Sequence, residues 1–234
     1  MKTRVITAVL ALAALSLSAC DEEPSASIST TGLKLNAHVT VNEDGSDVFM
    51  SVDKPGSAWD TDYTLSGSDS LWIDLSGGRK QVDDGALFGG YWTKFDGDEL
   101  PSTVQVGFSR SGADMNATVP MPQKFALLAP AIQSTWSRSQ PLTLRWTSPA
   151  RDSVQITVTG DCIEQAQFDV QVPESGTFTV PAGSLHTAAA YPASATCWMA
   201  VGISRIQQSV TPAPFVGGTL IGERNERFLL SSSQ

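Results

Sequence analysis

Apolar and polar residues alternate with a period of two over most of this chain, beginning at Leu33. Every second residue from Leu33 to Val41 is apolar, and the alternation resumes at Val48 after the polar segment Asn42–Gly45. This pattern predicts strands with one buried face, and the Asp-Gly pair between two such runs predicts a hairpin. The pattern recurs at Leu71–Leu75, Val104–Phe108, Ala117–Val119, Leu142–Trp146, Val154–Val158, Phe168–Val172, Phe178–Val180 and Cys197–Ile203.

Turn-forming residues separate most of these runs, and only Ser184–Ala190 favours a short helix. The predicted fold class is therefore all-β, with antiparallel sheets packed as sandwiches. Two long polar stretches, residues 53–70 and 76–90, are expected to be loops. The Pro-Met-Pro segment at 120–122 divides the chain into a first sandwich over residues 33–121 and a second over 122–234. A single larger sandwich or barrel is the alternative.

The first 19 residues have the composition of an export signal. Lys2 and Arg4 are followed by an apolar and small-residue stretch of 15 residues, Val5–Ala19, which is shorter than the roughly 20 that a permanent membrane helix needs. Leu17-Ser18-Ala19-Cys20 resembles the lipobox of bacterial lipoproteins. That resemblance implies cleavage before Cys20 and its modification by a thioether-linked diacylglycerol and an N-acyl chain. An ordinary signal followed by a chance cysteine is the alternative.

Two or three acyl chains would hold the protein firmly at a membrane, so the expected location is the cell envelope, with the body in the periplasm or at the cell surface. Residues 20–32 are mostly polar and predict a lipidated, flexible tether. Asp21 resembles the inner-membrane retention signal of enteric bacteria, but acidic residues after the cysteine mark surface export in other lineages. The choice of membrane therefore stays open.

The acidic charge disfavours several partners. Without residues 1–19 the chain keeps 13 basic and 24 acidic residues, a formal charge of −11 compared with −9 for the full sequence. Such a body repels phosphate backbones, so nucleic acid is not an expected partner. The glycine pairs 77–78 and 89–90 lack the following helix and Lys-Ser/Thr of a phosphate-binding loop, and no cofactor is expected.

With Cys20 assigned to lipid, Cys162 and Cys197 remain as an even pair in an oxidising compartment, which predicts a disulfide. The strand alternation supports this pairing, because it places both sulfurs on the apolar sides of their strands. A metal pair or two buried thiols is the alternative. The sequence lacks a CxxC spacing and holds only two histidines, so a zinc site is disfavoured.

The second half resembles an immunoglobulin-like or fibronectin-III-like domain. Residues 141–149, with Trp146, look like a B strand carrying its core tryptophan, 152–160 like a C strand, and 195–205 like an F strand. Antibody domains differ, because their disulfide joins strands B and F. The whole chain is similar to bacterial lipoproteins with two such domains, a likeness that implies no activity.

The sequence predicts no catalytic and no metal-binding residues. It lacks a Gly-x-Ser-x-Gly elbow, and a triad would need His38, on the polar face of a strand, or His186, in the one helix-favouring segment. Cysteines joined in a disulfide cannot act as nucleophiles. The acidic stretches 60–62, 83–85 and 96–99 are expected to form turns, with calcium binding as the alternative.

Aromatic residues of the first half form the candidate binding surface: Trp59, Tyr63, Tyr91 and Trp92 lie in or beside the two polar stretches. Trp72 is expected on the opposite face of its strand from Leu71 and Ile73. Exposed aromatic rings stack on sugars or anchor protein interfaces, whereas buried rings would cap the ends of a small core.

The expected function is a membrane-anchored, non-catalytic binding or structural module with another envelope protein as partner. One alternative is a carbohydrate-binding module that uses Trp59 and Trp92 to bind a glycan. Another is a hydrolase with an unrecognised carboxylate pair.

Overall fold

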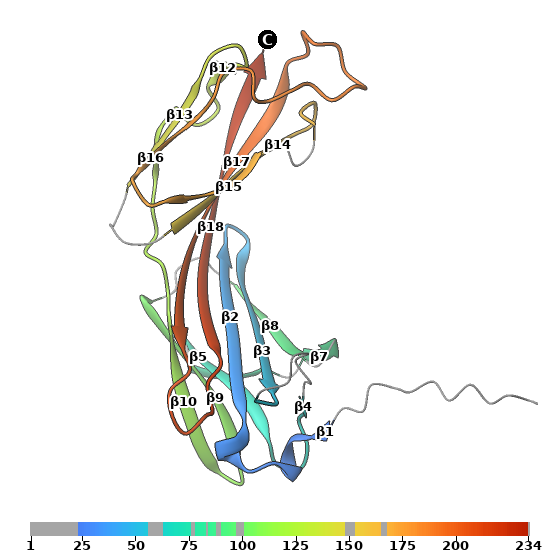
Figure 1. Cartoon of the computed structure of the whole chain (residues 1–234), viewed down its shortest axis with the longest axis vertical. Coiled ribbons are helices and arrows are strands. Elements are labelled where there is room, and N and C mark those ends of the chain that lie inside the picture. Colours follow the sequence, from blue (N-terminus) through green and yellow to red (C-terminus); the bar gives the residue numbers. More distant parts are fainter. Residues whose placement is uncertain are drawn as a thin grey trace, which may run out of the picture.

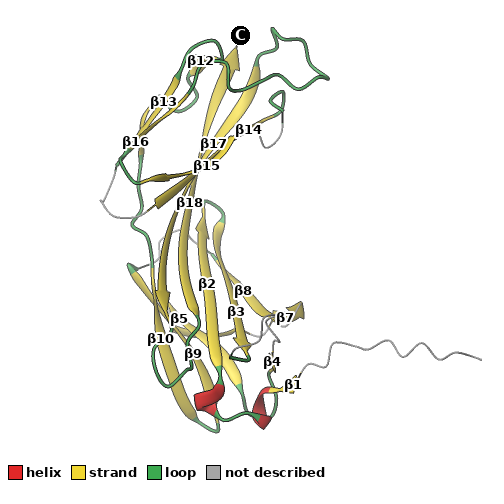
Figure 2. Cartoon of the chain, in the orientation of Figure 1, coloured by secondary structure: helices red, strands yellow, loops and turns green. Residues whose placement is uncertain are grey.

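The computed structural model describes residues 23–55, 63–75, 78–82, 84–87, 90–96, 101–147, 153–164 and 168–233. These residues form two β-sandwiches, one above the other in Figure 1, with two short 3-10 turns and no α-helix among them (Figure 2). The predicted all-β fold class is confirmed. None of these residues forms a helix that is long and apolar enough to cross a membrane.

The first sandwich packs a four-stranded sheet, in the order β10-β9-β5-β6, against one part of a nine-stranded sheet. The alternating residues of the facing strands fill the space between the sheets, so Leu35, Met50, Ile73, Val106 and Phe108 are fully buried. The four-stranded sheet contains β5 (Ser70–Leu75), β6 (Gly78–Val82), β9 (Thr103–Arg110) and β10 (Ala113–Pro120). The facing strands are β2 (Lys34–Asn42), β3 (Gly45–Asp53), β7 (Asp84–Leu87) and β8 (Gly90–Phe95).

The second sandwich has the strand arrangement of an immunoglobulin domain, with strands A, B and E in one sheet and C′, C, F and G in the other. The first sheet contains β11 (Leu127–Ala129), β13 (Leu142–Trp146) and β16 (Thr177–Val180). The other contains β14 (Ser153–Gly160), β15 (Phe168–Pro173), β17 (Cys197–Val210) and β18 (Thr219–Ser233), and β12 (Thr135–Ser137) pairs in parallel with the end of β18. Trp146 is buried in this second core, as the B-strand resemblance implies.

The long hairpin β17–β18 joins the two sandwiches. Its upper part pairs with β14 in the second sandwich, whereas residues 220–224 pair in parallel with β2 of the first (Figure 1). Phe215 and Leu220 accordingly pack in the first core. The range 122–234 therefore contributes residues to both sandwiches, which the strand periodicity alone does not predict.

Two expectations about loops and helices are wrong. Residues 76–90, expected to be one loop, contain β6 and β7, and β8 begins at Gly90. The strand β6 escaped the period-two pattern because four of its five residues are exposed. Ser184–Ala190 forms turns rather than a helix, and its backbone bonds elsewhere: Ala188 N donates to Cys162 O over 2.9 Å.

The segment predicted to be a flexible tether is docked on the first sandwich from Glu23 onward. Glu23–Pro24 (β1) pairs with Tyr63–Thr64 (β4), and two 3-10 turns follow at Ser25–Ser27 and Thr30–Gly32. Ser25 is fully buried, and its hydroxyl donates to Asp69 Oδ2 over 2.6 Å. Only residues 20–22 of the predicted tether lie outside the described residues. The tether expectation is therefore corrected for residues 23–32.

Arg110 holds this docked segment in place. Its Nε donates to Asp69 Oδ1 over 2.9 Å, and its Nη2 donates to Asp69 Oδ2 over 2.6 Å and to Ser25 O over 2.7 Å. Burial raises the pKa of Asp69, but hydrogen bonds from Arg110 and Ser25 and the charge of Arg110 outweigh it and hold the pKa below its usual value. Asp69 is therefore a buried carboxylate that depends on Arg110.

Replacing Arg110 by methionine is expected to lower the free energy of unfolding by about 2–4 kcal/mol at pH 7, because Asp69 would stay buried without its counter-charge. A lowered carboxyl pKa stabilises the fold above the usual aspartate pKa, and this contribution is lost as the pH falls through the lowered value. The deficit of the variant should therefore shrink toward about pH 2. Urea unfolding of the unchanged protein and the variant, at pH 7 and at about pH 2, measures this difference in the free energy of unfolding.

The control is Lys94→Met, which removes an exposed ion pair with Asp47 and should change stability by less than about 0.5 kcal/mol. A deficit in Arg110→Met that is equally large in acid would show that Asp69 is not the group left unpaired.

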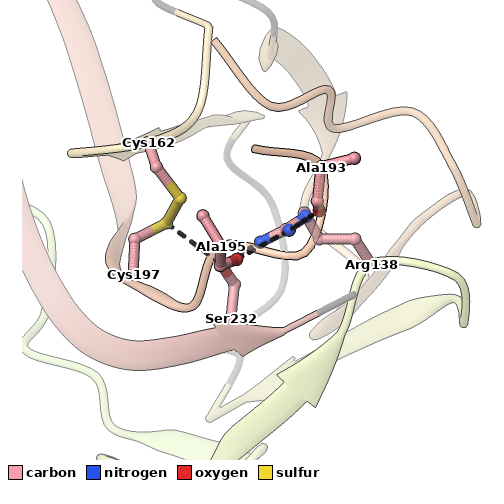
Figure 3. The surroundings of a disulfide bond; sticks show 6 residues. All are labelled: Arg138, Cys162, Ala193, Ala195, Cys197 and Ser232. Carbon is pink, nitrogen blue, oxygen red and sulfur yellow. Dashed lines mark hydrogen bonds between the residues drawn. A yellow bond between two sulfur atoms is a disulfide. The ribbon is translucent and has the colours of Figure 1, made fainter. Parts of the chain in front are cut away.

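The predicted disulfide is confirmed. Cys162, in the turn after β14, is bonded to Cys197 at the start of β17, with their Cα atoms 5.8 Å apart (Figure 3). The bond thus joins neighbouring strands of one sheet, unlike the bridge of antibody domains, which crosses from strand B to strand F. Arg138 lies beside it and donates to Ser232 Oγ over 2.9 Å and to the carbonyls of Ala193 and Ala195 over 2.9 and 2.8 Å. The disulfide and Arg138 together fix the long connection between β16 and β17.

Candidate binding surface

The structure corrects the aromatic surface expected on the first sandwich. Tyr63 is 1% exposed and packs in the first core, and Tyr91 is buried with its hydroxyl accepting from Leu65 N over 2.8 Å. These two rings cap the core and are not available to a ligand. Trp59 lies outside the described residues. Of the four, Trp92 alone is seen at the surface, with 39% of its area exposed.

Trp92 has an aromatic neighbour that the sequence pattern did not single out. Phe49 lies directly opposite Trp92 in the β3–β8 pairing, on the outer face of the sheet. Its ring covers Gly90 so closely that a Cβ added there would lie 2.0 Å from it. Trp72 covers Gly107 in the same way on the opposite sheet, beneath the guanidinium of Arg79 at 3.8 Å. These rings therefore shield glycine backbone.

A furrow crosses the outer face of the second sandwich. Its floor lies on β17, where the outward-facing residues Ala200 and Gly202 are small. The flanking strands carry larger residues in the same rows: Thr159 and Leu229 lie either side of Ala200, and Thr157 and Arg227 either side of Gly202. The small side chain of Ala200 leaves the hollow open there, whereas Thr157 covers Gly202 and its Oγ1 would lie 2.4 Å from a Cβ added to that glycine.

Trp198 forms one end of this furrow. It is 55% exposed and lies one outward position beyond Ala200 on β17. The part of the furrow beside Trp198 has a volume of about 600 Å³, and Asp161 and Asp169 also line it. An exposed indole next to a hollow lined by charged and hydroxyl groups makes this the candidate binding site among the described residues.

The furrow continues toward the first sandwich. This second part, about 450 Å³ in volume, shares Thr157, Thr159, Ala200 and Arg227 with the first and is bounded by the β2–β3 turn at residues 42–44. Asn225 Nδ2 donates to Asn42 Oδ1 over 3.0 Å and fixes the turn beside the sheet. The acidic side chains Glu43, Asp44, Glu223 and Glu226 line it.

Glu223 connects the furrow to His38. His38 Nε2 lies 2.7 Å from Glu223 Oε2, and Ser204 Oγ donates to Glu223 Oε1 over 2.9 Å. The hydrogen bond with His38, supported by Ser204 and opposed by burial, holds the pKa of Glu223 below its usual value. His38 is thus partly exposed, as expected of a residue on the polar face, but it is bonded to a carboxylate on β18.

Three carboxyl groups of the described residues, those of Asp69, Asp114 and Glu223, have pKa values lowered by hydrogen bonds from their neighbours. A glycosidase of the expected carboxylate type needs one acid with a raised pKa. Across the same residues no group of three or more His, Cys, Asp or Glu side chains could hold a metal ion.

No protein-family model and no curated protein matches this sequence. Among solved structures, the crystal structure of DIP-gamma Ig1 and Ig2 is similar over 86% of this chain and 98% of that chain, with 7% identical residues and a TM-score of 0.22. The immunoglobulin-like description of the second sandwich rests on its own strand order and not on this similarity.

Proposed function

We propose that this chain is a non-catalytic binding protein of a bacterial envelope, anchored by lipid on Cys20, that captures a partner protein in the furrow of its second sandwich. The anchor is supported by the match of residues 17–20 to a lipobox. It is also supported by the disulfide Cys162–Cys197, since such bonds persist outside the cytoplasm. Both are properties of an exported protein.

The furrow at Trp198 is the observation on which the binding function rests. A large, half-exposed indole beside a hollow offers a partner more apolar area than any single residue around it. The neighbouring Arg227, Asp161 and Asp169 can orient polar groups of the partner. Single exposed apolar residues are common on protein surfaces, so the proposal rests on the hollow beside the exposed ring of Trp198 and not on the exposure alone.

A glycan is the second candidate for the same site. Sugar rings stack on exposed indoles, and their hydroxyls bond to the carboxylates, guanidinium and threonines that line the furrow. This candidate moves the carbohydrate-binding alternative from Trp59 and Trp92 to Trp198.

Replacing Trp198 by alanine is expected to weaken partner binding at least about thirtyfold, the loss typical of an interface hot spot. Thr159→Trp should act similarly, because the new ring would cover Ala200 and fill the hollow. The measurement is crosslinking and pull-down from membranes with the lipidated protein, in parallel with binding to a glycan array.

Thr143→Trp is the matched control, since Thr143 is an exposed strand threonine on the opposite sheet. It should capture the same partners as the unchanged protein. Equal capture by all three variants would overturn the furrow as the binding site. Binding to glycans alone, lost in Trp198→Ala, would replace the protein partner by the second candidate.

A further inference from the structure

The turn between β17 and β18 exposes an apolar, uncharged surface at the base of the first sandwich. Val210 is 74% exposed and Val216 is 53% exposed, and Pro212, Ala213 and Pro214 between them are exposed as well. No charged residue occurs from 206 to 222, although 17% of the chain is charged. We call residues 210–216 the apolar turn.

Contacts with the first sandwich fix the apolar turn in place with its two valines outward. Phe215 packs in the first core, and Thr211 Oγ1 donates to Leu35 O over 2.7 Å. Val216 N donates to Leu33 O over 2.9 Å, so the turn is fixed against the chain that enters β2. These contacts keep the side chains of Val210 and Val216 pointing away from the first core.

The apolar turn and the entry of the chain lie at the same end of the molecule. Figure 1 shows the β17–β18 turn at the end of the first sandwich that faces away from the second, where β1 and the two 3-10 turns also lie. Cys20 precedes Glu23 by three residues, which span at most about 11 Å of extended chain. A lipid on Cys20 would therefore hold this end of the body against the membrane.

We infer that the apolar turn enters the headgroup region of the membrane in which Cys20 is anchored, an inference that rests on the proposed lipidation. Valine and proline without neighbouring charge suit that region, where each apolar side chain adds to the attachment. The rest of the body is acidic and is repelled by anionic lipid, so an uncharged surface is the one that can approach closely. This contact would orient the furrow of the second sandwich away from the bilayer.

Hydroxyl-radical footprinting with mass spectrometry tests the contact. The lipidated protein is placed in phosphatidylethanolamine–phosphatidylglycerol vesicles and compared with the Cys20→Ala protein in solution. Oxidation of the peptide that contains Val210 and Val216 should fall several-fold in vesicles. Oxidation at Leu128 and Ile132, exposed apolar residues of the second sandwich, should not change.

Two results would overturn the inference, and they differ from a failure of the anchor. Protein that sediments with vesicles but is oxidised equally at Val216 refutes the contact and leaves the anchor standing. Protection that persists in detergent, or rises with protein density in the vesicles, assigns the turn to a second copy of the chain. Protein that does not associate with vesicles at all refutes the proposed lipidation itself.

A paired variant strengthens the test. Val210→Asp with Val216→Asp should stay on the vesicles through its lipid but lose protection at Pro214. Leu128→Asp with Ile132→Asp should keep the protection. Retained protection in the first variant would contradict the inference, and unchanged thermal unfolding in both shows that they fold.

Discussion

Replacing Arg205 by methionine is expected to lower the free energy of unfolding by about 3–5 kcal/mol, the largest effect of any single substitution considered for this chain. Arg205 and Glu174 are both fully buried, with Arg205 Nε 2.9 Å from Glu174 Oε2. Removing the guanidinium would take this counter-charge away from a carboxylate that is buried in the interior. The cost of keeping that charge buried without Arg205, rather than the lost attraction, causes most of the destabilisation.

The groups around Arg205 explain why it is retained in a core. Its Nη1 donates to Gln123 O over 3.3 Å, its Nη2 donates to Thr147 O, and its guanidinium lies 4.2 Å from the ring of Phe125. Trp146 Nε1 donates to Glu174 Oε1 over 2.6 Å. The pair thus ties β17 to the chain that enters the second sandwich and to its core tryptophan.

Chemical unfolding in urea measures this effect, and the double variant Arg205→Met with Glu174→Gln is the control. Glutamine keeps an acceptor for Trp146 but removes the stranded charge, so the double variant should recover part of the loss. A single variant that loses less than about 1 kcal/mol would contradict the role assigned to the pair.

Replacing both Cys162 and Cys197 by alanine is expected to lower the free energy of unfolding by about 3–4 kcal/mol. The bond closes a loop of 34 intervening residues, and the chain-entropy estimate for such a loop has this size. The loop contains β15, β16 and the long connection to β17, so the effect should be confined to the second sandwich. Hydrogen exchange should accelerate there more than in the first.

Reduction of the unchanged protein by dithiothreitol is the companion measurement and should give the same loss. Arg138 and its bonds to Ala193 and Ala195 remain in both cases, so the connection should stay folded at low temperature. Equal stability of oxidised and reduced protein would show that the bond does not stabilise the native fold.

Strands with one buried face were predictable because their apolar residues are buried and their polar residues are exposed, one position after the other. In β2 the alternation of buried and partly exposed residues over Lys34–Asn42 follows the apolar pattern directly. The disulfide was predictable for a related reason. Two cysteines remain once Cys20 is assigned to lipid, and the alternation places both on the apolar sides of their strands. The immunoglobulin-like arrangement was predicted from a resemblance, which Trp146 and the strand-like segments after it carry.

Strand pairings and hydrogen bonds between distant segments were not predictable. The pairing of β18 with β2 depends on residues about 180 positions apart, and no local pattern records it. The docking of residues 23–32 depends on Arg110, whose polar neighbours Ser109 and Ser111 give no sign of a buried partner. Polar segments are predicted to be flexible unless such a partner is known.

The sequence contains one signal for the furrow. Trp198 lies on the polar phase of its strand, between Cys197 and Met199, so an exposed tryptophan could have been inferred there. The hollow itself depends on Ala200 lying between Thr159 of β14 and Leu229 of β18. That juxtaposition appears only once the register of three strands is known.

Mass spectrometry of the mature N-terminus tests the account most directly. Protein extracted from membranes is predicted to begin at Cys20 and to carry diacylglycerol and an N-acyl chain on it, whereas the Cys20→Ala protein is predicted to leave the membrane fraction. A membrane-bound protein whose N-terminal peptide retains residues 1–19, or whose Cys20 carries no lipid, would contradict the proposed anchor.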